Sequence, residues 1–394
     1  MQMTSSRAGL SEFMEVVPES DMPVKSFSIV DGILLLICVT SPWTNGIFAY
    51  SSDGEPISLS GLPNDGTIEP IRAQPRSKAG YFESSTIGKP PTIYGIEPAN
   101  KRVFVWMTTP TRISLPRLIT IKTWFNSQDG TRIPISLSYR DDVKLDDRTP
   151  TMLTAYGGFG VIDTLRYSNR SFLWTAFGGL YVHVGIRGGG ELGIKWHQEG
   201  LREKKQNSFD DFVAAAEWLL SQGYTVPTKL AIVGGSNSGL LVGAALTQRP
   251  DLFAAVVCFG PLLDMLRYHL FAGAAIGLPE YGSPAVPAEY EYLRRYSPYH
   301  QVKDGVAYPA VLFISGDADT RCDPMHARKM AARLQQATSS SRPVLLDYRK
   351  NRGHSGLLPL GQRIETITNQ FCFLMEQLSL ELDEKNLFRH IPPL

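Results

Sequence analysis

The stretch Lys229-Leu-Ala-Ile-Val-Gly-Gly-Ser-Asn-Ser-Gly239 decides the fold. An apolar run typical of a buried strand is followed by two glycines, a serine and further small residues. An apolar helical pattern comes next. Such a strand–turn–helix holds its serine in strained backbone, so the neighbouring positions must lack bulky side chains. Gly234 and Gly235 meet this need, whereas Ser238 stands where a second glycine is usual. We interpret Ser236 as a candidate nucleophile; a glycine-rich turn with an incidental serine is the alternative.

Around this stretch, buried-strand runs alternate with helical patterns. A hairpin is expected from residues 119–125 and 133–139, and strands from 152–156, 180–186, 230–234, 254–259, 310–315 and 343–348. Helices are expected over residues 209–222, 239–248, 324–337 and 362–380. Apolar strands that alternate with helices indicate a mostly parallel sheet covered on both faces. Residues 115–394 are therefore predicted to form one α/β domain.

Residues 1–114 have a different character. Short strand-like runs at 28–30, 33–40, 46–50, 80–83, 91–96 and 102–108 are separated by turn formers, and no amphipathic helix is evident. If these runs are propeller blades of roughly 40–45 residues, there is material for about two, whereas a closed ring needs about four. We expect an incomplete blade assembly or small cap. Unclosed edges invite a homo-oligomer or an extra covering segment.

Composition excludes several classes of protein. With 394 residues, two to three domains are expected at roughly 150 residues each. A net charge of +1 argues against a nucleic-acid or membrane-seeking surface. The longest apolar run, 33–39, is far too short to span a bilayer, and residues 1–7 do not resemble a secretory signal. The four scattered cysteines predict neither a zinc site nor a disulfide framework. We expect a cytoplasmic protein without metal or cofactor.

A serine hydroxyl is a weak nucleophile, so a carboxylate and a histidine base should follow it in that chain order. The run 311–315 ends in Gly316-Asp317-Ala-Asp319, where α/β sheets carry functional groups. The next run, 344–348, leads to His354 on a loop with glycines on both sides, and we assign His354 as the base. Asp319 and Asp317 both remain candidates for the acid, because Asp317 could instead tie its loop through backbone N–H groups.

One glycine motif is set aside. Gly188, Gly190 and Gly193 satisfy the Gly-x-Gly-x-x-Gly pattern of dinucleotide sites and follow the strand run 180–186. Such a site needs an apolar helix to begin there, but the following residues lack an apolar stripe and break at Gly200. A dinucleotide site is therefore not expected.

From about residue 115 to its end, the sequence resembles the catalytic domain of the prolyl oligopeptidase family of serine peptidases. The motifs that carry the resemblance include Ala155-Tyr-Gly-Gly-Phe159, Ile186-Arg-Gly-Gly-Gly-Glu191, Lys205-Gln-Asn-Ser-Phe-Asp-Asp-Phe212, Gly234-Gly-Ser-Asn237, Gln248-Arg-Pro-Asp-Leu-Phe253, Tyr296-Ser-Pro-Tyr299 and Asp319-Thr-Arg321. The preceding residues resemble only the last blade or two of that family's propeller. The resemblance implies an α/β-hydrolase fold preceded by a partial propeller.

The resemblance also implies roles for individual residues. It makes Ser236 the nucleophile, His354 the base and Asp319 the orienting acid, which decides between the two aspartates. It places the oxyanion hole at the backbone N–H of Asn237 and the hydroxyl of Tyr156. Substrate-binding positions fall on Arg321, which would bind a substrate carbonyl, and on the pocket residues Phe159, Leu262, Tyr281 and Cys322.

The implied function is an acyl-enzyme hydrolase of amide bonds in small peptides, with cleavage after proline as one option. One departure weakens the preference for proline. The family's tryptophan, four residues before the tyrosine of Glu280-Tyr-Gly282, is replaced here by Gly277, which removes a large apolar wall. The alternative is therefore an esterase, thioesterase or acyl transferase of a biosynthetic pathway that uses the same triad. A third reading, an inactive fragment that binds peptides, conflicts with the complete triad.

Overall fold

The computed structural model describes residues 15–111, 115–354 and 358–381. Its larger part is built on an eight-stranded sheet with the order β16-β15-β14-β13-β11-β12-β10-β9. The strands of this sheet are β9 (Leu118–Asn126), β10 (Arg132–Arg140), β11 (Thr151–Ala155), β12 (Leu180–Val184), β13 (Leu230–Gly235), β14 (Ala255–Phe259), β15 (Ala310–Gly316) and β16 (Val344–Arg349). All neighbours from β12 to β16 pair in parallel, and the β9–β10 hairpin adds the antiparallel end. The prediction of a mostly parallel sheet is confirmed.

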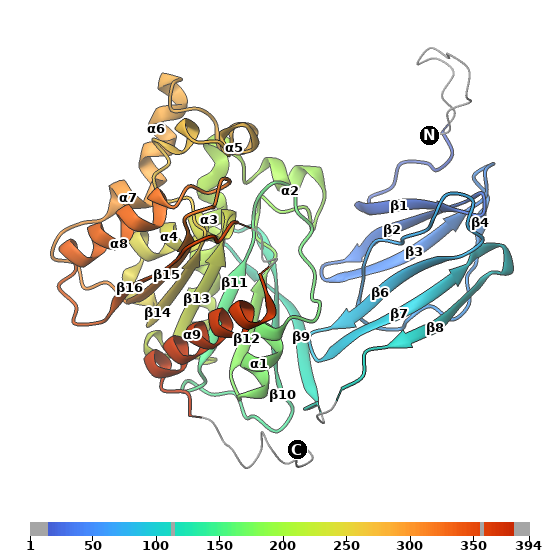
Figure 1. Cartoon of the computed structure of the whole chain (residues 1–394), viewed down its shortest axis with the longest axis horizontal. Coiled ribbons are helices and arrows are strands. Elements are labelled where there is room, and N and C mark those ends of the chain that lie inside the picture. Colours follow the sequence, from blue (N-terminus) through green and yellow to red (C-terminus); the bar gives the residue numbers. More distant parts are fainter. Residues whose placement is uncertain (1–14, 112–114, 355–357, 382–394) are drawn as a thin grey trace.

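Helices cover both faces of this sheet (Figure 1). They are α1 (Asn169–Ala176), α2 (Ile194–Gln198), α3 (Lys205–Ser221), α4 (Asn237–Gln248), α5 (Ala274–Tyr281), α6 (Pro287–Tyr296), α7 (Pro298–Gln301), α8 (Met325–Ala337) and α9 (Leu360–Leu378). The helices α1 and α9 pack on one face, against a core that contains Trp174 and Phe371. The helices α3, α4 and α8 pack on the opposite face, around Phe209 and Phe313. The four predicted helices are therefore confirmed within a few residues, whereas α1, α2, α5, α6 and α7 were not predicted.

The chain before β9 forms two four-stranded antiparallel sheets, as the β-rich pattern predicted. They consist of β1 (Val24–Val30), β2 (Ile33–Ser41), β3 (Thr44–Tyr50) and β4 (Pro56–Ile57), then β5 (Thr67–Ile68), β6 (Gly80–Thr86), β7 (Lys89–Glu97) and β8 (Arg102–Thr108). Leu35 and Ile37 of the first sheet share one buried cluster with Phe82 and Ile96 of the second. The predicted boundary between 114 and 115 adjoins residues 112–114, which lie outside the described residues.

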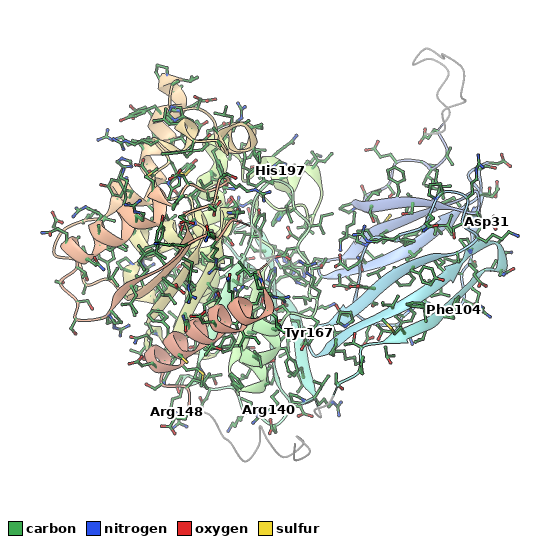
Figure 2. The ribbon with its side chains drawn as sticks, viewed as in Figure 1. Asp31, Phe104, Arg140, Arg148, Tyr167 and His197 are labelled. Atoms are coloured by element: carbon green, nitrogen blue, oxygen red, sulfur yellow. The ribbon has the colours of Figure 1, made fainter. Side chains whose placement is uncertain are left out.

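A few specific contacts join these sheets to the α/β part. The indole of Trp43 meets the imidazole of His183 edge to face, with ring centroids 4.8 Å apart. The backbone N–H of Tyr167, labelled at the junction in Figure 2, donates to the hydroxyl of Ser85 at 3.2 Å. Nowhere in the described part of the chain is a helix both long and apolar enough to cross a membrane.

Candidate active site

Ser236 occupies a strained turn between β13 and α4. Its φ of +55° and ψ of −123° lie outside the regions that L-residues usually adopt. A Cβ at Gly234 would lie 2.1 Å from the carbonyl oxygen of Ser238, and one at Gly235 would lie 1.9 Å from the ring of Phe259. Both positions therefore require glycine. The Ser238 hydroxyl accepts from the N–H of Gly235 and donates to its carbonyl, each at 2.8 Å, so this serine ties the turn together.

Asp319 and His354 come together at the carboxyl edge of the sheet. The Nδ1 atom of His354 lies 2.8 Å from Oδ2 of Asp319, which is only 5% exposed. The other oxygen of Asp319 accepts from the backbone N–H groups of Arg321 and Cys322 at 3.0 and 2.9 Å. An ionised carboxylate only accepts hydrogen bonds, so the imidazole carries its proton on Nδ1 and leaves Nε2 available as a base.

Asp317, the competing carboxylate, has a different environment. Its Oδ1 accepts from the backbone N–H of Asn351 at 2.6 Å, and its own N–H donates to the carbonyl of Arg349. It thus joins the loop after β15 to the loop that carries His354. This is the loop-tying arrangement considered for Asp317 from the sequence.

The three candidate triad residues line one cavity of about 280 Å³, together with Tyr156. Ser236 comes from the end of β13, Asp319 from the loop after β15 and His354 from the loop after β16. The structure thus brings the serine, the carboxylate and the imidazole to one place.

The side chain of Asn237 is locked between two residues of the site. Its Nδ2 donates to the carbonyl of Tyr156 at 2.6 Å, and its Oδ1 accepts from the hydroxyl of Tyr281 at 2.8 Å. A Cβ at Gly158 would lie 2.5 Å from the same amide, so the loop after β11 can approach only with glycine there. Burial raises the pKa of Tyr156, which keeps its hydroxyl protonated and able to donate.

A buried ion pair between Lys205 and Glu280 contacts the two segments that hold the Asn237 side chain. The ammonium of Lys205 donates to the carbonyl of Gly157 at 2.8 Å and to Oε1 of Glu280 at 2.9 Å. Oε2 of Glu280 lies 2.8 Å from Nε2 of His197. Burial alone would favour the neutral acid, yet the charge of Lys205 and these hydrogen bonds hold the pKa of Glu280 below its usual value. Because Gly157 follows Tyr156 and Glu280 precedes Tyr281, the pair links both partners of the Asn237 side chain.

A second cavity, of about 40 Å³, is also lined by Ser236 and shares no other lining residue with the first. It is lined by all five residues assigned to substrate binding from the sequence, namely Phe159, Leu262, Tyr281, Arg321 and Cys322. The rings of Phe159 and Tyr281 meet at right angles, with centroids 5.6 Å apart. Burial raises the pKa of the Cys322 thiol to about 12, so this cysteine is a neutral, apolar wall.

Gly277 lies in the same cavity and is covered by Tyr268. A Cβ at Gly277 would lie 2.8 Å from Cε2 of Tyr268, and the two aromatic residues Tyr268 and Tyr281 meet edge to face at 5.7 Å. The hydroxyl of Tyr268 donates to the carbonyl of Gly282. Tyr268 thus places an aromatic ring over Gly277, at the edge of the cavity where the sequence lacks the family's tryptophan. Sequence analysis missed this residue because its contact with Gly277 exists only in the folded chain.

His326 is another lining residue that sequence analysis did not assign to the pocket. It lies in the first turn of α8, is 1% exposed, and its Nδ1 accepts from the backbone N–H groups of Leu263 and Asp264 at 3.3 and 3.0 Å. Burial lowers the pKa of His326 to about 4, so the ring is neutral at pH 7. Its proton is then on Nε2, which makes it a neutral hydrogen-bonding wall and not a base.

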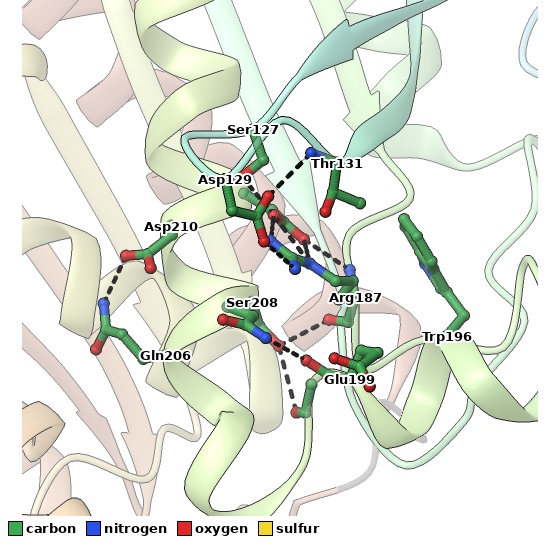
Figure 3. A network of polar contacts seen from close by, with 12 residues as sticks. Ser127, Asp129, Thr131, Arg187, Trp196, Glu199, Gln206, Ser208 and Asp210 are labelled. Carbon is green, nitrogen blue, oxygen red and sulfur yellow. Dashed lines mark hydrogen bonds and ion pairs between the residues drawn. The ribbon is translucent and has the colours of Figure 1, made fainter.

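The turn that contains Arg187 has a structural role (Figure 3). The guanidinium of Arg187 binds Asp211 of α3 through several hydrogen bonds and Asp129 of the β9–β10 loop at 2.6 Å. The hydroxyl of Ser208 donates to the carbonyl of Arg187 at 2.7 Å. The glycines that follow Arg187 form a turn held by α3. The helix that begins after Gly193, α2, is five residues long and has no buried residue.

Within residues 15–111, 115–354 and 358–381, no group of three or more His, Cys, Asp or Glu side chains is placed to hold a metal ion. The candidate site described above offers the chemistry of its own side chains. It combines a serine on a strained turn, an oriented imidazole, and two candidate donors for an oxyanion.

Comparisons with known proteins agree with this geometry. Residues 165–381 match the prolyl oligopeptidase family. A prolyl endopeptidase of Elizabethkingia miricola is 35% identical over 339 residues, which is 86% of this chain and 48% of the relative. A dual-function macrocyclase-peptidase of Galerina marginata is 36% identical over 66% of this chain and 36% of its own length. The chain thus spans about half the length, or less, of the curated relatives it matches.

Solved structures show the same similarity. One, from a study of two prolyl endopeptidases, superimposes with a TM-score of 0.91 at 38% identity, over 95% of this chain and 55% of that chain. Prolyl oligopeptidase B of Galerina marginata, bound to a 35-residue hydrolysis and macrocyclisation substrate, gives a TM-score of 0.84 at 29% identity, over 93% and 52%. These matches confirm the α/β-hydrolase fold preceded by propeller-like sheets.

Proposed function

Because the chain belongs to the prolyl oligopeptidase family, we propose that it is a serine peptidase that cleaves amide bonds of small peptides through an acyl-enzyme on Ser236. The observation that carries the proposal is the pairing of His354 with the buried Asp319, in the cavity that Ser236 also lines. If His354 had only a structural role, there would be no reason for it to line a cavity together with a serine in strained backbone.

In the proposed reaction, Nε2 of His354 takes the proton of the Ser236 hydroxyl as the oxygen attacks the substrate carbonyl. The negative charge that develops on the carbonyl oxygen is stabilised by the N–H of Asn237 and the hydroxyl of Tyr156. His354 then gives its proton to the leaving amine, and the C–N bond breaks. Water hydrolyses the ester on Ser236 by the same steps in reverse order. Asp319 orients the imidazole and stabilises its charged form throughout.

We assign the residue on the acyl side of the bond to the cavity between Phe159, Tyr268 and Tyr281. Its volume of about 40 Å³ and its aromatic walls suit a small apolar side chain such as that of proline or alanine. Arg321 at the rim is assigned to a peptide carbonyl next to the scissile residue. The prolyl endopeptidases among the relatives support proline, and Tyr268 offers a replacement for the wall absent at Gly277.

The test is a panel of blocked dipeptide anilides that differ only in the residue before the anilide, measured with the wild-type chain and with Ser236→Ala. The proposal expects release of the anilide after proline or alanine, little after phenylalanine, and none with Ser236→Ala. Activity that persists in Ser236→Ala would overturn the assignment of the nucleophile.

A second candidate, acyl transfer, is favoured by the similarity to the macrocyclase-peptidase. In that reaction an amine attacks the ester on Ser236 in place of water, and a new amide forms. Adding an amino-acid amide to the anilide assay separates the two outcomes, because transfer yields the coupled peptide and hydrolysis yields the free acid. Faster cleavage of simple esters than of any anilide would instead favour an esterase.

A further inference from the structure

A third cavity, of about 220 Å³, adjoins the candidate triad on the face of the sheet that α1 covers. It shares Tyr156, Ser238 and Phe259 with the cavity that holds Ser236 and His354. Nothing in the proposed reaction uses the polar groups deeper in this cavity. The most prominent of them is the guanidinium of Arg170, in the first turn of α1.

Arg170 has no carboxylate within salt-bridge distance among the described residues. Its Nη2 donates to the neutral side-chain amide of Gln370 at 3.1 Å, and its central carbon lies 4.9 Å from the ring centre of Phe259. Its Nε is shielded from solvent and has no hydrogen-bond partner in the described part of the chain. Burial lowers the pKa of Arg170, which reflects the cost of holding an unpaired charge in this place.

The other charged groups around the cavity form no ion pair with Arg170 among the described residues. The carboxylate in the cavity lining, Asp163, has its Oδ2 3.2 Å from Nε2 of His183. The exposed guanidinium of Arg166 lies 3.7 Å from Glu69 of the β-sheet region. Glu191 is buried nearby, and burial raises its pKa to about 8, so it is mostly neutral at pH 7. Arg170 therefore has no carboxylate in direct contact among the described residues, and Tyr181 lines the same cavity.

We propose that this cavity is a carboxylate-binding subsite, in which Arg170 holds the free C-terminal carboxylate of the substrate's leaving segment. The planar guanidinium presents donors in the geometry that suits a carboxylate. A bound carboxylate would also give Arg170 the counter-charge that the protein does not supply. The inference rests on the proposed function and deepens it, because it makes short peptides with a nearby free C-terminus the preferred substrates.

The orientation of the peptide, with its acyl side and its leaving segment in different cavities, follows from the two cavities that Ser236 lines. The acyl side is assigned to the aromatic cavity with Phe159 and Tyr281. His354, which must protonate the leaving amine, lines a different cavity, and this one shares three lining residues, among them Phe259, with the cavity of Arg170. The guanidinium of Arg170 lies over the ring of Phe259, which also lines the cavity of Ser236, so we place Arg170 on the side of the leaving segment.

The kinetic test uses blocked alanyl-prolyl peptides extended by one to four alanines, each made with a free C-terminal carboxylate and as the carboxamide. We expect one short length at which the free acid has a KM at least tenfold below that of its amide, consistent with a charge-assisted hydrogen bond. Arg170→Gln should abolish this difference and leave the amide unchanged, and Arg170→Lys should restore part of it. Arg148→Gln, which removes an exposed cation paired with Asp146 far from the cavity, is the matched control.

A binding test separates this inference from the proposed function. Alanyl-alanine and its amide are titrated calorimetrically into Ser236→Ala and into Ser236→Ala/Arg170→Gln, so no turnover is needed. The proposal expects the dipeptide to bind the first protein more tightly than its amide does, and the second protein to lose this difference. Equal binding of dipeptide and amide to Ser236→Ala would overturn the subsite, even with an active wild-type enzyme. Preferential dipeptide binding with an inactive wild-type chain would instead contradict only the proposed reaction.

Discussion

Nδ1 of His354 and Oδ2 of Asp319 lie 2.8 Å apart, and this contact joins the loops that follow the two last strands of the sheet. The remaining oxygen of Asp319 is fixed by two backbone N–H groups. The carboxylate therefore cannot rotate away from the imidazole without losing these bonds. The imidazole, which lines the same cavity as Ser236, is held in one tautomer by residues far apart in the sequence.

This contact predicts the effect of Asp319→Asn. The amide nitrogen of asparagine would face Nδ1 of His354, which moves the ring proton to Nε2 and removes the base. We expect kcat on a proline anilide to fall by about 10³–10⁴ with little change in KM, the size of effect known for this tautomer change in serine proteases. Asp317→Asn is the matched control, because the Asp317 carboxylate accepts from the backbone N–H of Asn351 and its loss should cost far less. A loss below tenfold in Asp319→Asn would contradict the assignment.

The Lys205–Glu280 pair predicts a large effect on stability. Lys205→Met leaves a buried carboxylate without its ammonium, and losses of this kind cost about 3–5 kcal/mol. The free energy of unfolding, measured in urea, should fall by that order. Adding Glu280→Gln removes the stranded charge and should recover part of the loss. If the double variant is less stable than Lys205→Met, the pair is not coupled in the way the distances indicate.

Tyr268 is predicted to set the size of the acyl pocket. Tyr268→Ala removes the ring that covers Gly277, so larger side chains gain room beside Ser236. We expect kcat/KM for a leucine anilide to rise relative to proline by about tenfold or more, since one pocket contact is worth roughly 1–3 kcal/mol. The ratio of the two rates measured in one assay is independent of the amount of folded protein. An unchanged ratio would remove Tyr268 from the specificity pocket.

His326 predicts how stability depends on pH. The unfolded chain takes up a proton on this histidine below about pH 6.5, whereas the folded chain does so only near its lowered pKa of about 4. The unfolded state therefore binds more protons in this window, and stability falls as the pH decreases from 6.5 to 4. A shift of this size corresponds to roughly 3 kcal/mol. His326→Asn keeps an acceptor for the two N–H groups but cannot titrate.

Urea unfolding of wild type and His326→Asn between pH 7 and pH 4.5 measures this contribution. The variant should lose less stability than the wild type as the pH decreases, so the difference between them should shrink or change sign. Parallel pH profiles would show that His326 is protonated equally in both states.

The parts of the fold that follow from periodic local patterns were predictable. Long apolar strands and the amphipathic α3, α4, α8 and α9 have strong periodic signals, and their order gave the parallel sheet. The helices α1 and α5 are short, and α5 contains Pro279 and glycine, so their patterns resemble loops. They form because tertiary packing buries them, as with Trp174 of α1 beneath the sheet.

The candidate site also has some features that the local sequence predicts and others that depend on tertiary contacts. The elbow glycines, the two loops with Asp319 and His354, and the strand ends that present them are local features. The ion pair of Lys205 with Glu280, the cover of Tyr268 over Gly277 and the isolation of Arg170 depend on residues distant in the chain. No spacing or composition indicates such contacts, because the fold alone brings their partners together.

The most direct test of the account is covalent labelling with a fluorophosphonate, followed by peptide mass spectrometry. The account predicts one stable adduct per chain, located on Ser236, with labelling much slower in His354→Ala and absent in Ser236→Ala. An unlabelled, folded wild-type chain, or an adduct on another residue that persists in Ser236→Ala, would contradict the claim that the strained turn, imidazole and carboxylate form one catalytic centre.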